Sequence, residues 1–292
     1  MFCKDYTIKE QKKLKPYDIK NRKGLSMKVY IHTDLEGVCD FYNWDEADIP
    51  TSRGVGYTKE FLTQEVNAAI EGICSVVPNA EIVVEDGHGG GYYGPNILAE
   101  KLNRQAKLVV GRFNSHLSTI DAEFDLFMII GAHAMAGTAR GQMNHTLSKN
   151  TIYNVLLNKK PIGEIGICAA IAGYYNVPFA LASGDYWAMK EAEELMENLE
   201  TVAVKKGLNS YCAECLNPDV ARELIRDAAK KAASSKHIYK PYKIQGRIEV
   251  QIDYFHTEHA DDAERKNGGK RVGGRSVMFE GDDLRQLFNR CF

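Results

Sequence analysis

The sequence predicts an α/β protein whose mainly parallel sheet is covered by helices and is followed by a smaller C-terminal α+β unit. Short β-rich runs alternate with amphipathic helical stretches through most of the chain. Such alternation is typical of βαβ units, which build a parallel sheet. The expected strands are Lys28–Thr33, Glu81–Glu85, Lys107–Val110, Leu126–Ile130, Val177–Leu181 and Thr201–Val204. The expected helices lie near Thr58–Val76, Pro95–Leu102, Glu164–Tyr175 and Tyr186–Leu195.

The alternation stops after about residue 205. A helix near Asn217–Ala233 precedes two expected strands, Lys243–Asp253 and Arg271–Phe279, and a final helix begins at Asp282. We therefore divide the chain into an N-terminal extension (1–26), an α/β domain (27–205) and a smaller α+β domain (206–292).

The expected extension is basic. Residues 1–26 hold eight Lys or Arg against three Asp or Glu, and they show little apolar periodicity. This composition is typical of a solvated segment rather than of a packed element. Met27 starts a strand-like run, so we expect the compact part of the chain to begin there.

The bulk composition argues against several classes of protein. Of the 292 residues, 44% are hydrophobic and 26% are charged, which is an ordinary globular profile. The apolar runs are too short to cross a bilayer and the N-terminus lacks the apolar core of a secretory signal, so we expect a cytoplasmic protein without membrane contact. Seven scattered cysteines do not indicate a disulfide framework. A net charge of −2 argues against nucleic acid as a partner.

Polar side chains that suit a metal follow the expected strands. Asp34 and Glu36 come directly after the first strand, and residues two apart on an extended chain point to the same side. Neighbouring carboxylates repel each other unless a positive charge lies between them. His88 follows the second strand in a glycine-rich turn, His133 follows the fourth strand, and Glu164 stands at a helix start. Because ligands gather at the carboxyl ends of parallel strands, we expect these five side chains to converge.

The ligand types indicate which metal would bind. Oxygen and imidazole donors without thiolate suit zinc, with manganese or cobalt as substitutes. Three carboxylates and two histidines are too many for one catalytic zinc that keeps an open position. They suit two cations roughly 3.5–4 Å apart, bridged by a carboxylate and by water. The sequence therefore predicts a two-metal hydrolase.

A further histidine, His145, lies in a polar loop shortly after His133. Since the metal set is complete without it, His145 is free to act as a nucleophile, a general base or a donor to the transition state. The alternative is a loop histidine that only bonds to the backbone.

The sequence has a family resemblance that runs from Met27 to near the C-terminus, and six short segments carry it. They are Met27–Gly37, Gly131–Ala134, Met143–His145, Pro161–Gly166, Ala172–Pro178 and Ser183–Asp185. In order and approximate spacing they resemble the D-aminopeptidase (DppA, dipeptide transport protein) family of zinc metallopeptidases. This resemblance implies two Zn²⁺ per subunit, with Asp34 as the bridging ligand and the other four residues completing the site.

The same resemblance implies a role for His145, because it stands where the family has its catalytic nucleophile. It also implies removal of N-terminal residues from short peptides of D-amino acids. The implied assembly is a homo-oligomer, a ring-stacked decamer whose active sites face a central channel.

Some features depart from the family or leave other readings open. Residues 1–26 have no counterpart, and His256 and His259 are spaced to share a helix face, as a second metal site or, more simply, as a solvated charged face. The Tyr- and Gly-rich loop after His88 and the segment Asp40–Tyr57 are expected to line the substrate pocket. Another metal-dependent amidohydrolase, an L-specific peptidase and a non-catalytic peptide-binding protein stay open as alternatives.

A nucleotide-binding protein is the other alternative. Gly89, Gly91 and Gly94 match the spacing of the dinucleotide fingerprint after a strand. The expected helix that follows is short and begins with a proline, and the next expected strand does not end in the acidic residue that would hold a ribose. We therefore favour the histidine before these glycines as a metal ligand.

Overall fold

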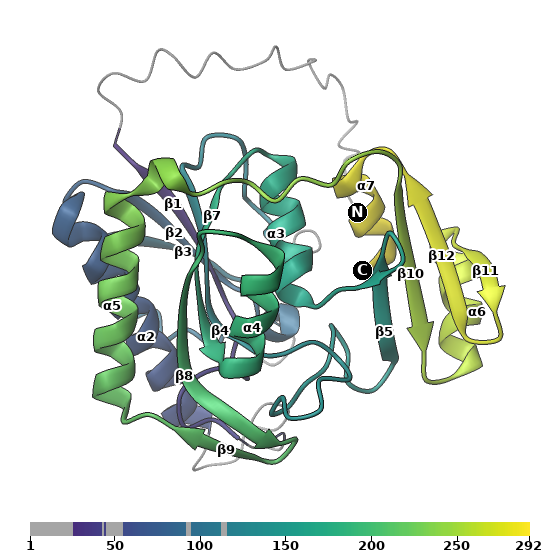
Figure 1. The fold of residues 1–292 in the computed structure, drawn as a ribbon, viewed down its shortest axis with the longest axis horizontal. Coiled ribbons are helices and arrows are strands. Elements are labelled where there is room, and N and C mark those ends of the chain that lie inside the picture. The colour runs from purple at the N-terminus through teal and green to yellow at the C-terminus, as the bar shows by residue number, and fades with distance from the viewer. Residues whose placement is uncertain (1–25, 43, 45–54, 92–94, 112–115) are drawn as a thin grey trace, which may run out of the picture.

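The computed structural model describes residues 26–42, 44, 55–91, 95–111 and 116–292, so that the expected extension lies almost wholly outside the described residues. Within these residues the larger sheet has seven strands in the order β3-β2-β1-β4-β7-β8-β9 (Figure 1). All neighbouring strands in it are parallel except β8 and β9. The strands are β1 (Lys28–Thr33), β2 (Glu81–Asp86), β3 (Ala106–Val109), β4 (Leu126–Ala132), β7 (Phe179–Asp185), β8 (Glu200–Asn209) and β9 (Cys212–Cys215).

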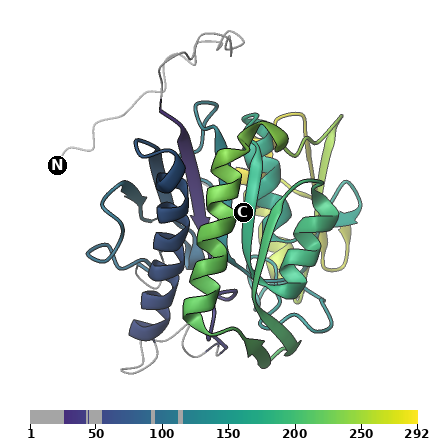
Figure 2. The same cartoon turned by 60° about the vertical axis from the view of Figure 1, so that its left-hand side comes forward.

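Helices cover both faces of this sheet. In β1, Val29 and Ile31 enter one buried core, whereas Tyr30 between them points into the other. Figure 2 shows α2 and α5 side by side over one face, and these two helices pack against each other. The four covering helices are α2 (Val55–Val76) and α5 (Pro218–Ser234) on one face, and α3 (Glu164–Tyr174) and α4 (Tyr186–Leu195) on the other. None of the described helices is both long and apolar enough to span a bilayer.

The second sheet is antiparallel and stands beside the first (Figure 1). In the described residues its strand order is β11-β12-β10-β5-β6. One buried core contains residues of both sheets and of α3, so the two sheets are fixed to each other. The elements of this part are β5 (Ile152–Leu157), β6 (Lys160–Pro161), β10 (Ile248–Tyr254), α6 (Thr257–Asn267), β11 (Lys270–Gly273), β12 (Ser276–Gly281) and α7 (Leu284–Cys291).

The predicted fold class is confirmed, and two predicted elements are wrong. Each expected strand of the parallel sheet overlaps an observed strand. Pro95–Leu102 forms turns instead of a helix, because the N–H of Leu98, which a helix would bond to a carbonyl four residues earlier, donates to the side-chain oxygen of Thr63 in α2 (3.0 Å). Arg271–Phe279 is not one strand but two, β11 and β12, with a reversal between them.

The boundary expected at residue 205 stays a prediction, and the sheets divide the chain at other places. It falls inside β8, and α5, which follows it, packs on α2 and on the larger sheet. Conversely, β5 precedes residue 205 but pairs with β10 in the second sheet. The chain thus passes from the first sheet to the second and back, which brings side chains of both to one pocket.

Candidate active site

The carboxyl edge of the parallel sheet collects polar side chains from three adjacent strands, β2, β1 and β4. Asp34 follows β1, and His133 follows β4. His88 opens the short 3₁₀ helix η2 (His88–Gly91) after β2. Because β1 lies between β2 and β4, its acidic loop lies between the two histidines.

The loop after β1 lies directly on β4. The N–H of Asp34 donates to the carbonyl of Ile130 (2.9 Å), and the N–H of Gly37 donates to that of Gly131 (2.8 Å). A Cβ at Gly37 would stand 2.0 Å from the carbonyl oxygen of Ala132. Only glycine permits this approach, which holds the two acidic side chains of the loop at the end of β4.

A third carboxylate comes from the start of α3. Glu164 is the first residue of that helix, where the dipole favours a negative charge. Its Oε1 accepts a hydrogen bond from the backbone N–H of Leu147 (2.7 Å), which fixes the direction of the carboxylate.

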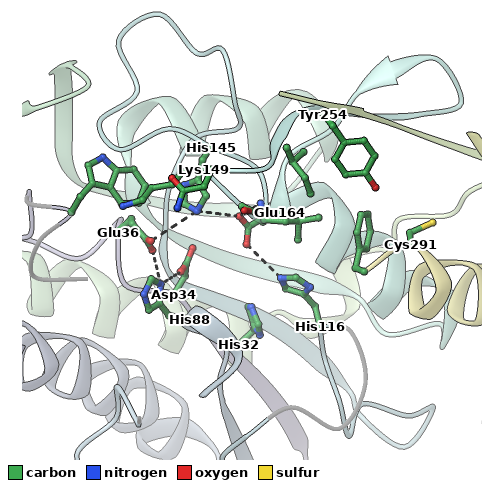
Figure 3. Close-up of a pocket in the computed structure, with 18 residues that line it drawn as sticks. His32, Asp34, Glu36, His88, His116, His145, Lys149, Glu164, Tyr254 and Cys291 are labelled. Atoms are coloured by element: carbon green, nitrogen blue, oxygen red, sulfur yellow. Dashed lines mark hydrogen bonds and ion pairs between the residues drawn. The ribbon is translucent and has the colours of Figure 1, made fainter. Parts of the chain in front are cut away.

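These five side chains, all predicted from the sequence as ligands, lie together, and Figure 3 shows Asp34, Glu36, His88 and Glu164 of them. His88 Nδ1 is 2.9 Å from Glu36 Oε2 and 3.4 Å from Asp34 Oδ1. His133 Nε2 is 3.2 Å from Asp34 Oδ2 and 3.2 Å from Glu164 Oε1. The two oxygens of Asp34 therefore face two different histidines.

The donor atoms fit divalent cations. His133 Nδ1 lies 3.0 Å from the carbonyl oxygen of Ala134, which can only accept, so Nδ1 carries a proton and Nε2 is the atom free to bind a cation. Although burial lowers it, the carboxylates of Asp34 and Glu164 raise the pKa of His133 well above its usual value when no cation lies between them. His133 Nε2 and Glu36 Oε2 are buried without an aligned hydrogen bond. Two overlapping groups have donor atoms within 4.8 Å of one another: Asp34, Glu36 and His133, and His133, His145 and Glu164. A lone pair that faces carboxylates in a buried place needs a positive charge between them.

The ionisation of each group in the cluster depends on the charges of its neighbours. Burial and the neighbouring Glu36 carboxylate raise the pKa of Asp34. Although burial acts in the opposite direction, His88 holds the pKa of Glu36, and His133 that of Glu164, well below the usual range. The carboxylates stay ionised only beside positive charge, which either imidazole protons or metal cations provide.

His145 stands over this cluster with one nitrogen free. Its Nδ1 donates to the carbonyl of Met143 (2.9 Å), so that Nε2 offers a lone pair, 3.7 Å from Glu164 Oε1 and 4.0 Å from Glu36 Oε1. Its ring stacks on that of His133 with centroids 4.0 Å apart. Burial, followed by the charge of His133, lowers the pKa of His145, which favours the neutral imidazole. The Nδ1 atom thus makes the backbone hydrogen bond of a loop histidine, and the Nε2 atom lies where it could act as a nucleophile, a base or a ligand.

Sequence reasoning missed His116, which also reaches the site. Its Nε2 is 3.4 Å from Glu164 Oε2 (Figure 3), whereas the N–H of Leu147 bonds to the other oxygen, Oε1. Arg285 of α7 donates to the carbonyl of His116 (2.6 Å) and holds it there. No local pattern marks His116, because the contact that places it comes from the other end of the chain.

Sequence reasoning also missed a pair of residues that lies beneath the cluster, His32 and Glu85. His32 Nδ1 is 2.8 Å from Glu85 Oε2, and both side chains are buried. Burial raises the pKa of Glu85, but the hydrogen bond and charge of His32 outweigh it and bring it to about 2. Glu85 also accepts the N–H groups of Leu117 and Ser118, so the pair anchors the loop that carries His116. A sequence signal existed for His32, which stands two residues before Asp34 on the same side of the strand.

A pocket of about 370 Å³ opens over the cluster, and both sheets line it. Trp44 and Lys149 lie at its wall together with His145. A neighbouring pocket of about 400 Å³ shares His145, Lys149 and Ile152 with it. The other pocket segments expected from the sequence, most of Asp40–Tyr57 and the tyrosines after the glycine turn, lie outside the described residues.

The two minor sequence hypotheses find no support among the described residues. His256 and His259 stand 6.1 Å apart, centroid to centroid, at the start of α6, and neither belongs to a group of donor atoms close enough to hold a metal. Residues 95–102, which come after the glycine turn, form turns and not the long helix that a dinucleotide site requires.

The family model of peptidase M55, D-aminopeptidase, matches residues 27–291 of the chain. The chain belongs to this D-aminopeptidase family. It is 30% identical over 266 residues to the D-aminopeptidase of Bacillus subtilis (strain 168), which covers 90% of this chain and 94% of that relative. The family resemblance predicted from the short segments is thereby confirmed.

A solved structure supports the same family assignment. It is that of the Zn-dependent D-aminopeptidase DppA from Bacillus subtilis, a self-compartmentalizing protease. The similarity has a TM-score of 0.83 at 29% identity and covers 91% of this chain and 95% of that one. As a member of the D-aminopeptidase family, the chain is a peptide hydrolase.

Proposed function

We propose that this chain is a dinuclear-zinc aminopeptidase that removes N-terminal residues from short peptides, with peptides of D-amino acids as its substrates. The observation that carries the proposal is the convergence of three carboxylates and two histidines, where His133 Nε2 and Glu36 Oε2 are buried without an aligned hydrogen bond. The Zn-dependent D-aminopeptidase among its relatives supports zinc as the metal and D-peptides as the substrate.

The contacts of Asp34 support two cations rather than one. Its Oδ1 faces His88 and Glu36 lies beside that histidine, whereas its Oδ2 faces His133 and Glu164 lies beside that one. Asp34 thus divides the ligands into two sets of three and belongs to both. A carboxylate in this position is a bridging ligand.

The residues of the chain prepare the site for amide hydrolysis. When bound, the two cations supply a Lewis acid for the peptide carbonyl and lower the pKa of water. His145, held neutral by burial, directs Nε2 at the cluster, either to attack the carbonyl carbon or to accept the proton of the attacking water. The free amine of the peptide would be held by the second cation or by a nearby carboxylate, which would restrict cleavage to the N-terminal residue.

Two further properties belong to this proposal. We expect a homo-oligomer, a decamer in the form implied by the sequence resemblance, and the self-compartmentalizing relative supports this expectation. The cytoplasm stays the predicted compartment. Manganese or cobalt would satisfy the same oxygen and imidazole donors if zinc were replaced.

Metal analysis coupled to assays of matched D- and L-alanyl dipeptides tests the proposal. We expect two zinc ions per chain, hydrolysis of the D-peptide, loss of activity with a chelator and recovery when zinc is returned. Equal or faster cleavage of the L-peptide would indicate an L-specific or unselective peptidase. A metal-loaded protein that cleaves only other amides would indicate a different amidohydrolase. Full peptide hydrolysis by metal-free protein would refute the metal mechanism.

A further inference from the structure

The active-site pocket has an apolar side that the proposed chemistry does not use. Ile152 and Tyr254 are opposite each other in the pairing of β5 with β10, and both line the pocket. Cys291 and Phe292, at the end of α7, line it as well. We call these four residues the apolar wall.

The apolar wall is firmly held in place. Tyr254 is 9% exposed and Cys291 is 6% exposed. Burial raises the pKa of Tyr254 to about 12, so that its hydroxyl stays neutral at ordinary pH. Phe292 packs on Phe288 with ring centroids 5.6 Å apart, and its N–H donates to the carbonyl of Phe288. A preformed apolar surface of this kind gains binding energy from an apolar group without first paying an ordering cost.

The other side of the pocket contains a basic side chain, whereas the apolar wall contains none. Lys149 is the only lysine or arginine among the described residues that line it, and its ammonium lies 3.9 Å from the centre of the Trp44 ring. Trp44 in turn meets the ring of His145 edge to face at 5.2 Å. Figure 3 shows Lys149 beside His145, whereas Tyr254 and Cys291 lie on the opposite side of Glu164.

This asymmetry orients a peptide in the pocket. A short peptide carries a carboxylate on the part that leaves, and this polar part suits the side of the pocket that Lys149, Asn150 and His145 line. The scissile carbonyl has to lie at the metal cluster, so the side chain of the N-terminal residue extends toward the other side. We propose that the apolar wall is the subsite for this side chain and that it selects uncharged, apolar N-terminal residues, leucine before alanine. This inference rests on the proposed aminopeptidase function.

The expected selectivity follows from the chemistry of the wall. A hydrophobic subsite commonly discriminates by roughly 10–200-fold for each methylene group that it contacts. A charged side chain would lose its hydration there, and none of the four side chains of the apolar wall would pair with it. His116, which also lines the pocket, faces the carboxylate of Glu164 instead.

The test uses the full-length zinc-loaded protein and a series of dipeptides whose N-terminal residue is alanine, leucine, glutamate or lysine, in both D and L forms. We expect kcat/KM for leucine to exceed that for alanine by about 10-fold or more, with glutamate and lysine below alanine. Free leucine, as a product, should inhibit more strongly than free alanine. A flat profile, or a preference for a charged residue, overturns the inference while leaving the aminopeptidase function standing. Absence of hydrolysis across the whole series overturns both.

Two variants locate the selectivity. Ile152→Phe fills the subsite and should reduce the leucine-to-alanine ratio about 10-fold, whereas Phe292→Ala opens it and should shift the preference toward phenylalanine. Phe255→Ala is the matched control, because Phe255 lines the neighbouring pocket and not this one. Zinc content and circular dichroism establish that each variant is folded. If both subsite variants keep the wild-type ratios, or if Phe255→Ala changes them equally, the apolar wall is not the subsite.

Discussion

Replacement of Asp34 by asparagine keeps the shape of the side chain and removes its charge. The two oxygens of Asp34 lie 3.4 Å from His88 Nδ1 and 3.2 Å from His133 Nε2, so a cation on either side has this carboxylate as a neighbour. A unit charge at 4 Å contributes about 4 kcal/mol at an effective dielectric constant of 20, and the remaining amide oxygen offsets part of that loss. We therefore expect both zinc ions to bind about 10²–10³-fold more weakly in Asp34→Asn.

Titration of metal-free protein with zinc against a chelating dye measures both affinities. Glu36→Gln and Glu164→Gln are the matched controls, since each removes a carboxylate from one set of ligands only. We expect each control to weaken one zinc ion strongly and the other much less. If Asp34→Asn retained one zinc ion at the wild-type affinity, Asp34 would not bridge, and the assignment of two sets of ligands around it would be wrong.

Three other perturbations test separate parts of the site. His145→Ala should lower kcat by about 10²–10⁴-fold at unchanged zinc content, measured by steady-state kinetics and elemental analysis; loss of zinc would show instead that His145 is a ligand. His116→Gln should weaken zinc binding by about 10-fold, because His116 orients Glu164, whereas the exposed His237→Gln should not; equal affinities in the two variants would contradict this role. Glu85 has a depressed pKa of about 2, so its contribution to stability is present above the unfolded-state pKa of about 4.5 and is lost as pH falls toward 2. The difference in unfolding free energy between wild type and Glu85→Gln should therefore shrink by about 2 kcal/mol from pH 5 to pH 3, as measured by urea unfolding of metal-free protein, and a constant difference would contradict the ion pair.

The parallel sheet was predictable because its strands are buried on both faces. Such strands are short apolar runs, and Leu126–Ile130 is one that stands out in the sequence. The positions of Asp34 and His133 followed from the rule that parallel strands end at one edge of the sheet. Local pattern was enough for these residues, since each stands directly after its own strand.

Residues placed by distant contacts could not be predicted in the same way. His116 reaches Glu164 because Arg285 of the last helix holds the backbone of His116. Arg285 and His116 lie 169 positions apart in the sequence. β5 acquires its place by pairing with β10, and that pairing brings Ile152 opposite Tyr254 at the pocket. The failed helix at Pro95–Leu102 has a similar cause, because the side chain of Thr63, 35 positions away, accepts the N–H of Leu98 that a helix would bond internally.

A crystal structure of the zinc-loaded protein, with anomalous data collected at the zinc edge, tests the central claim most directly. The account predicts two anomalous peaks per chain, one on each side of Asp34, with Glu36 and His88 at the first and His133 and Glu164 at the second. A single peak, or two peaks that do not share Asp34, would contradict it.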